Sequence, residues 1–424
     1  MAFPKGFLWG CASSAYQVEG GNLRSNWAAW ERRKGLAPCG AAANSWDLWR
    51  EDLACLKALN ANAYRFSVEW SRVEPHPGEF DQAALDRYTE MARALRQAGI
   101  RPIVTLHHFS EPAWLYERRP KGWLEDGPEE DFTRFVDRVV LALRGEVDDW
   151  ITFNEPMVWL LSAYGLGRFP PGLHRIISLE RNFIKNGLID RVARAHRAAY
   201  LLIRGAIPKA RVAIAQNVVD LEPARPRVSD LEATQAWDRF MHRHLLDLLK
   251  SSKTLDFIGL NYYTRIFVRG SRLFPLGTMP CYRELEVLLG RPLFRLLGGR
   301  RGGRPETDMG WEIVPEGLGR VALSLWRAYG LPVFVTENGL ADAAGDRREA
   351  FLREHVAALA GAAAQGAELM GYLHWSLIDN YEWGDWGPRF GLFSVDRERG
   401  FRRDPAAGSK LFAELAASNG ACLS

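Results

Sequence analysis

The 424-residue sequence predicts an α/β protein, a (β/α)8 TIM barrel with expanded βα loops that forms a single domain over residues 1–424. Eight short apolar runs recur along the chain, and segments with the spacing of amphipathic helices lie between them. Successive runs are roughly 40 to 75 residues apart, more than a minimal βα unit needs, which indicates insertions in the loops. The runs lie near residues 7–12, 61–68, 101–108, 149–155, 211–217, 256–263, 332–337 and 369–377.

The segment between the second and third runs shows how helix and strand alternate. It begins at Asp81, carries Leu85, Tyr88 and Leu95 on one helical face, and ends at Gly99 just before the third run. A doubly wound open sheet is the competing arrangement, but no Gly-x-Gly-x-x-Gly motif follows the first run to support dinucleotide binding. The barrel is therefore preferred.

The composition excludes several functional classes. Apolar residues make up 47% and charged residues 25% of the chain, as in soluble globular proteins, and no run of about 18 apolar residues predicts a membrane span. The net charge of +4 is small for this length, so nucleic acid is not an expected partner. The nine histidines and five scattered cysteines show no metal-ligand spacing, and no metal or cofactor is expected. The N-terminus shows no secretory signal, which favours a cytoplasmic protein with reduced thiols.

The segment 269–305 differs from the rest of the chain because arginines alternate with leucine-rich pieces and glycine pairs. A solvated loop over one end of the barrel is the simpler interpretation. The mixture of basic and apolar residues leaves peripheral membrane contact as the alternative. The arginines are Arg269, Arg272, Arg283, Arg291, Arg295, Arg300, Arg301 and Arg304.

Two glutamates, Glu155 and Glu337, stand at the polar ends of the fourth and seventh runs. Pro156 ends the fourth run because it has no backbone donor, and it is expected to hold Glu155 in an extended conformation. Gly339 ends the seventh run just after Glu337. The carboxyl ends of barrel strands surround one pocket, so the two side chains are expected to meet there. A pair of carboxyl groups in one pocket is what cleavage of a glycosidic bond requires.

Polar and aromatic side chains also lie in or after the runs, and the amides, the imidazole and the carboxyl groups among them suit a ligand rich in hydroxyl groups. Some have a structural alternative: Arg65 as the ion-pair partner of a helix, Tyr263 as a core aromatic residue and Asn154 as a turn cap. His107 and His108 are adjacent in a strand and point to opposite faces, so a metal pair is not expected. In chain order the residues are Gln17, Arg65, His108, Asn154, Gln216, Asn217, Asn261, Tyr263, Trp375, Glu382 and Trp383.

Taken together and in this order, the motifs around these residues resemble those of glycoside hydrolase family 1, the β-glucosidase and β-galactosidase family, over nearly the whole chain. Agreement of so many ordered motifs is highly specific. The motifs are FLWG at 7–10, SAYQVEG at 14–20, AYRFS at 63–67, TLHHF at 105–109, TFNEP at 152–156, NYYT at 261–264, TENG at 336–339, WSLIDNYEW at 375–383 and RFGL at 389–392.

The resemblance implies a retaining double displacement in which Glu337 is the nucleophile and Glu155 the general acid and base. The family places Arg65 and the Tyr263 hydroxyl beside the nucleophile, where they are expected to favour ionised Glu337. Weaker solvation near that negative charge is expected to keep Glu155 protonated. Retention also predicts that the two carboxyl groups lie ~5 Å apart.

The resemblance also implies how the non-reducing-end sugar is bound. Asn154 is expected to bind the 2-hydroxyl, and Trp375 to stack beneath the ring, with a non-prolyl cis peptide bond after Trp375. Glu382 is expected to receive the 4- and 6-hydroxyls. The other substrate-binding residues implied are Gln17, His108, Tyr263 and Trp383.

Three departures from family patterns bear on specificity. Members that cleave 6-phosphosugars carry Ser, Lys and Tyr where this chain has Glu382, Pro388 and Phe390, so an unphosphorylated sugar is expected. The acid/base carboxylate that plant thioglucosidases lack is present, which favours O-glycosides. Phe109 stands where many members have Trp, and the segment 20–49 is shorter than usual, so the rim of the cleft is expected to differ.

The predicted function is hydrolysis of terminal non-reducing β-D-glucosyl and β-D-galactosyl residues, with β-D-fucosyl residues as a further substrate, through a covalent glycosyl-enzyme. Small β-glycosides or oligosaccharides are the expected partners. One alternative is a transglycosylase or glucosyltransferase that uses the same two carboxylates and passes the sugar to an alcohol. The other is an inactive sugar-binding barrel, which would be expected to lose one carboxylate.

Overall fold

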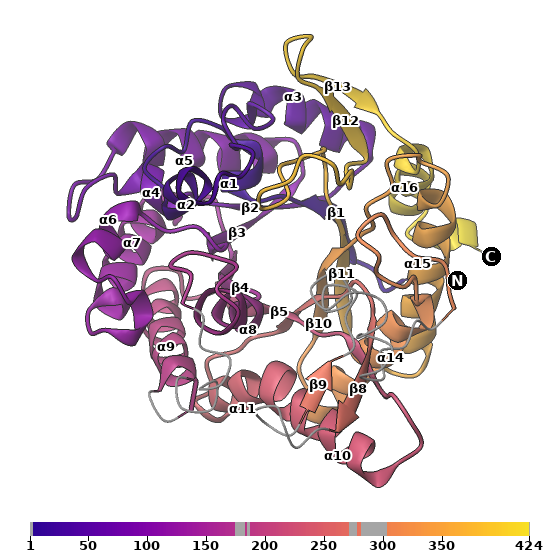
Figure 1. Cartoon of the computed structure of the whole chain (residues 1–424). Helices are drawn as coiled ribbons and strands as arrows, with labels where there is room; N and C mark the ends of the chain where they lie inside the picture. Colours follow the sequence, from indigo (N-terminus) through magenta and orange to yellow (C-terminus); the bar gives the residue numbers. More distant parts are fainter. Residues whose placement is uncertain (1–2, 174–182, 185–186, 271–277, 281–302, 424) are drawn as a thin grey trace.

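The computed structural model of the chain describes residues 3–173, 183–184, 187–270, 278–280 and 303–423. Eight parallel strands close into a barrel in the order β1-β11-β10-β7-β5-β4-β3-β2, and helices form a ring around it (Figure 1). The predicted (β/α)8 fold is confirmed, and each predicted run overlaps one barrel strand. The barrel strands are β1 (Leu8–Ala12), β2 (Ala63–Ser67), β3 (Arg101–His107), β4 (Asp149–Asn154), β5 (Arg211–Asn217), β7 (Ile258–Asn261), β10 (Val333–Asn338) and β11 (Leu369–Trp375).

The barrel is packed on both faces of its sheet. All six residues of β4 and all six of β10 are buried, as expected for parallel strands with helices outside and side chains inside. The outer helices turn one apolar face to the strands: α5 buries Leu85, Tyr88 and Leu95, and Asp81 caps it by accepting from Ala84 N at 3.0 Å. The outer helices are α3 (Ser45–Ala58), α5 (Gln82–Gln97), α7 (Pro128–Leu143), α9 (Leu188–Ala206), α11 (His244–Ser251), α14 (Pro315–Tyr329), α15 (Arg348–Ala364) and α16 (Ser409–Ala417).

The loops that follow the barrel strands carry further elements, as the long intervals predicted. Short helices follow each of the first four strands, and two small sheets, β6-β8-β9 and β12-β13, stand outside the barrel. These insertions surround the carboxyl ends of the strands. They are α1 (Ala15–Val18), α2 (Asn26–Lys34), α4 (Trp70–Val73), α6 (Ala113–Arg118), α8 (Pro156–Leu160), α10 (Val228–Trp237), β6 (Asp220–Pro223), β8 (Arg265–Gly270), β9 (Thr278–Pro280), β12 (Phe393–Asp396) and β13 (Arg402–Pro405), with 3-10 or π turns at Gly122–Leu124, Leu161–Gly165 and Asp238–Arg243. A further 3-10 turn, Ala421–Leu423, follows α16.

The two ends of the chain lie beside each other, next to the point where the barrel closes (Figure 1). Strand β1 pairs with β2 on one side and with β11 on the other. The Trp9 indole nitrogen donates to the Asn419 side chain at 3.0 Å, and Phe3 N donates to the Asn419 carbonyl at 3.1 Å. The C-terminal segment therefore helps to fix the first strand in the ring.

Among the described residues, no helix combines the length and the apolar character needed to cross a membrane. Most arginines of the segment 269–305 lie outside the described residues, so both interpretations of that segment stay predictions. Arg304, which is described, pairs with Glu316 of α14 at 3.0 Å. Four of the five cysteines are described, and these are free thiols.

Candidate active site

Glu155 and Glu337 lie at the same end of the barrel. Glu155 directly follows β4, Glu337 belongs to β10, and Asn261 ends β7, which lies between those two strands in the barrel. Asn261 Nδ2 donates to Glu155 Oε1 at 2.9 Å, and the charge of Glu337 is one cause of the raised pKa of Glu155, so the two carboxyl groups are close enough to interact. Only 7% of Glu155 and 3% of Glu337 is exposed. The structure therefore brings the two carboxyl groups together in a buried setting.

The backbone of Glu155 is left-handed, which corrects the extended conformation expected before Pro156. Its φ is 42° and its ψ is 53°. The reason is the direct turn from β4 into α8: Glu155 N still donates to Ala215 O at 2.6 Å, and Glu155 O already accepts from Trp159 N at 2.9 Å. A non-glycine residue in this region is strained, and such strain concentrates at functional sites.

Glu337 is held by a cation and a phenol. Arg65 Nη1 donates to Glu337 Oε1 at 2.6 Å, and the Tyr263 hydroxyl donates to Oε2 at 2.6 Å. Arg65 is completely buried on β2 and also donates to Thr105 Oγ1 at 2.9 Å, which fixes its position. Burial raises the pKa of Glu337, whereas Arg65 and the Tyr263 hydroxyl lower it, so both partners favour the carboxylate. The alternatives of a helix partner for Arg65 and a purely core role for Tyr263 do not describe these contacts.

Glu155 is held by two neutral amides. Asn217 Nδ2 and Asn261 Nδ2 donate to its Oε1 at 3.0 and 2.9 Å. Burial and the charge of Glu337 raise the pKa of Glu155 to about 7, and the amide bonds oppose that rise only in part. The surroundings of the two groups therefore differ: Arg65 and Tyr263 favour the charged form of Glu337, whereas burial and the charge of Glu337 favour the protonated form of Glu155.

Asn154 joins Arg65 to His108 and does not cap the following turn. Its Oδ1 accepts from Arg65 Nη2 at 2.7 Å and from Asn261 Nδ2 at 3.0 Å, so its Nδ2 donates to His108 Nε2 at 3.1 Å. Burial and the Arg65 charge lower the pKa of His108 well below its usual range, and the neutral ring carries its hydrogen on Nδ1 because Nε2 accepts. His108 Nδ1 is buried and has no partner among the described residues. This donor is available to a hydroxyl group of a ligand.

His107 points away from His108, as expected for neighbours in a strand. Its ring packs against Trp159 and Phe153 with centroid distances of 4.4 and 5.2 Å, and its Nε2 lies 3.5 Å from Glu111 Oε1. The two histidines are therefore not placed as a pair of metal ligands. In the described part of the chain, no group of three or more His, Cys, Asp or Glu side chains is arranged to hold a metal ion.

Glu382 is a third carboxyl group close to Glu155 and Glu337. Gln17 Nε2 donates to Glu382 Oε2 at 3.0 Å and to the Tyr381 carbonyl at 2.8 Å, which ties the loop after β1 to the loop after β11. Burial and the charge of Glu337 raise the pKa of Glu382 to about 8. A carboxyl group with two acceptor oxygens suits a pair of neighbouring hydroxyls.

Aromatic rings surround His108. Trp375 and Trp383 lie nearly parallel to the imidazole, with centroids 5.7 and 6.2 Å away, and the cis peptide bond expected after Trp375 is present. Trp383 also contacts Phe109 at 5.2 Å and Phe169 at 6.0 Å between centroids. Phe169 was not singled out from the sequence, because it lies in a loop without a recognisable motif.

Asn217 and Asn261, which contact Glu155, were revealed by the sequence only in part. They end β5 and β7, and they are register partners across these neighbouring strands. The sequence placed both at strand ends without assigning them a role, and that shared position was the available signal. Gln216, the neighbour of Asn217, faces away and donates to Met241 O at 2.6 Å.

Comparison with known proteins gives the family. The model of the family described as "Glycosyl hydrolase family 1" matches residues 1–253 and 246–421 of the chain. "Beta-glucosidase A" of Thermotoga maritima is 29% identical, with 93% of each chain covered, and a "Beta-galactosidase" of Sulfolobus acidocaldarius is 30% identical, with 99% of this chain and 96% of that protein covered. Among solved structures, a beta-glycosidase from Pyrococcus horikoshii is 32% identical, with a TM-score of 0.87, and the match covers 99% of this chain and 95% of that chain. A beta-glucosidase from Thermotoga maritima in complex with glucoimidazole is 26% identical, with a TM-score of 0.85, and the match covers 99% of both chains. The chain therefore belongs to glycosyl hydrolase family 1 and is an O-glycosyl hydrolase.

Proposed function

We propose that the protein is a retaining β-glycosidase in which Glu337 is the nucleophile and Glu155 the general acid and base. Glu337 attacks the anomeric carbon while Glu155 gives its proton to the departing glycosidic oxygen, and a covalent glycosyl-enzyme forms. Glu155, now a carboxylate, takes a proton from the water that attacks the anomeric carbon and releases Glu337. The observation that carries the proposal is the difference in partners: Arg65 and Tyr263 on Glu337, amides alone on Glu155.

The electrostatics of the pair support a change of role for Glu155 during the reaction. The charge of Glu337 is one cause of the raised pKa of Glu155. That charge disappears when Glu337 becomes an ester in the intermediate, and the two amides then favour the Glu155 carboxylate. Glu155 is therefore set up as an acid for the first step and as a base for the second.

We infer that the substrates are small β-glycosides or oligosaccharides with a terminal β-glucosyl or β-galactosyl residue, with β-fucosides as a further class. The relatives named beta-glucosidase and beta-galactosidase support this choice. Asn154 Nδ2 and His108 Nδ1 offer donors to sugar hydroxyls, and Glu382 offers acceptors. Retention of both carboxyl groups, each with distinct partners, argues against the inactive sugar-binding alternative.

Product stereochemistry tests the mechanism. During hydrolysis of p-nitrophenyl β-glucoside and β-galactoside, proton NMR should show the β-anomer of the sugar first, and an initial α-anomer would contradict the proposal.

Glu337→Gly tests the nucleophile. The variant should be inactive without azide and should form an α-glycosyl azide when azide is added, whereas an active variant would show that Glu337 is not the nucleophile. Adding an alcohol to the wild-type reaction measures how much intermediate is captured by transglycosylation.

A further inference from the structure

Two amide donors converge on one oxygen of Glu155. Asn217 Nδ2 and Asn261 Nδ2 lie 3.0 and 2.9 Å from Oε1, and Oε2 receives no hydrogen bond from the described residues. The two oxygens of this carboxyl group therefore have different surroundings, although both belong to one buried side chain.

The orientation of the two amides is set by the strands that carry them. Asn261 Oδ1 accepts from the Thr336 hydroxyl at 2.7 Å, so its Nδ2 must face Glu155. Asn217 is the register partner of Asn261 on the adjacent strand, which delivers its amide to the same oxygen. The convergence is therefore built into the barrel and does not depend on a loop.

We propose that Asn217 is a positioning residue which, together with Asn261, keeps the transferable proton of Glu155 on Oε2. This inference rests on the proposed acid role of Glu155. An oxygen that accepts two N–H groups has both lone pairs engaged, so a proton on Oε1 would displace one donor. During the first step the proton passes from Oε2 to the glycosidic oxygen, the bond from that oxygen to the anomeric carbon breaks as Glu337 attacks, and the aglycone leaves as an alcohol. The negative charge left on Glu155 spreads to Oε1, where two N–H groups already face it.

Asn217 can be tested more cleanly than Asn261. Asn261 also donates to Asn154 Oδ1 at 3.0 Å and accepts from Thr336, so its replacement disturbs several groups at once. The Asn217 side chain, among the described residues, bonds Glu155. It is half-buried at the end of β5, where a smaller side chain leaves the barrel core intact.

The test measures Asn217→Ala on aryl β-glucosides whose leaving groups span a wide range of pKa. We expect kcat/KM to fall about 10- to 100-fold for poor leaving groups, less than the full loss of a general acid, and to change little for a dinitrophenyl leaving group. The alkaline limb of the pH profile should move to higher pH, because a hydrogen bond that lowers the pKa of Glu155 is removed. Equal losses for all leaving groups with an unmoved limb would overturn the proposal.

Two further variants make the result decisive. Gln216→Ala removes an amide at the adjacent position, where the side chain faces the opposite way. Any change in kcat/KM relative to wild type should be the same for all leaving groups. Asn217→Asp keeps the shape of the side chain if Asn217→Ala does not fold, and should reduce turnover of poor leaving groups at least as strongly. Glu155→Ala is measured in parallel: lack of leaving-group dependence there refutes the proposed function, whereas dependence there but not in the Asn217 variants refutes the positioning role alone.

Discussion

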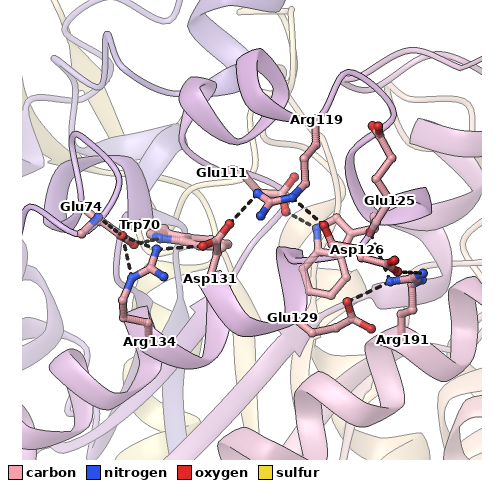
Figure 2. Close-up of polar contacts among 12 residues, drawn as sticks. Trp70, Glu74, Glu111, Arg119, Glu125, Asp126, Glu129, Asp131, Arg134 and Arg191 are labelled. Carbon is pink, nitrogen blue, oxygen red and sulfur yellow. Dashed lines mark hydrogen bonds and ion pairs between the residues drawn. The ribbon is translucent and has the colours of Figure 1, made fainter.

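An ion-pair network on the outside of the barrel and the pocket at its end both bury carboxyl groups, but they supply them with different partners. In the network, Arg134 lies 2.8 Å from Glu74 and 2.9 Å from Asp131, and Arg119 lies 2.7 Å from Asp131 (Figure 2). The Glu74 side chain is fully buried and also accepts from the Trp70 indole at 2.8 Å. Each of these carboxylates faces at least one guanidinium.

In the pocket, three carboxyl groups share one contacting guanidinium among the described residues. Arg65 contacts Glu337, whereas Glu155 and Glu382 accept from amides. Burial and the charge of Glu337 raise the pKa of Glu155 to about 7 and that of Glu382 to about 8, and the hydrogen bonds from amides oppose this rise only in part. Paired charges stabilise the outside of the barrel, whereas the carboxyl groups without a guanidinium partner lie where we propose that protons are transferred.

The largest expected effect is on activity and distinguishes the pocket from the network. Glu155→Ala should lower kcat/KM for an unactivated alkyl glucoside about 10²- to 10⁴-fold, because the leaving oxygen is no longer protonated. Formation of the glycosyl-enzyme from a dinitrophenyl glucoside should be largely spared. Steady-state and burst kinetics on both substrates measure the difference, and equal losses would argue against the acid role.

The next effect is on stability and concerns the network. Glu74→Ala should lower the free energy of unfolding by about 2–4 kcal/mol, because the buried Trp70 indole and the Gly78 amide lose their acceptor. Urea denaturation measures this loss, and kcat of the folded variant should stay at the wild-type value. Glu90→Ala, which removes the exposed pair with Arg50, is the control and should leave stability unchanged. Full stability of Glu74→Ala would contradict the structural role assigned to the network.

A moderate effect is expected in the pH dependence of kcat/KM, which reflects the pKa of Glu155. Glu155 must be protonated to act as an acid, so kcat/KM for a poor leaving group should fall as pH rises through about 7, by about tenfold per pH unit. Glu337→Gln removes a negative neighbour and should lower the pKa of Glu155, which carbon-13 NMR of labelled glutamate measures. An unchanged or higher pKa in that variant would show that the two groups are not coupled as described.

The smallest effect is a gain in stability, whereas removing a carboxylate from the network is expected to lower stability. The folded-state pKa of Glu155, about 7, lies above the value of about 4.5 in an unfolded chain, so the folded state binds more protons and stability falls as pH rises through that interval. Glu155→Gln cannot ionise and should therefore be more stable than wild type at pH 8 by about 1 kcal/mol, with a smaller difference at pH 5. Thermal unfolding at the two pH values measures this, and a destabilised variant at pH 8 would contradict the comparison.

Sequence patterns predicted the barrel because its strands are short apolar runs that parallel pairing buries on both faces. They also predicted which polar residues follow those strands, and the structure groups Glu155, Glu337 and Arg65 in one place. The left-handed backbone of Glu155 was not predictable, since it depends on how β4 meets both β5 and α8. The contact of Asn217 with Glu155 depends on strand register, and that of Phe169 on loop packing, and neither leaves a local pattern in the sequence.

The placement of β4 and β10 at distant points of the chain bears on how activity arises during synthesis. A growing polypeptide that has emerged only as far as β7 contains Glu155, the proposed proton donor, but not Glu337, the proposed nucleophile. Since the ring shuts only when β11 reaches β1, an incomplete product of translation has no finished pocket. Incomplete chains are therefore expected to lack the proposed activity, which requires the whole chain to have folded.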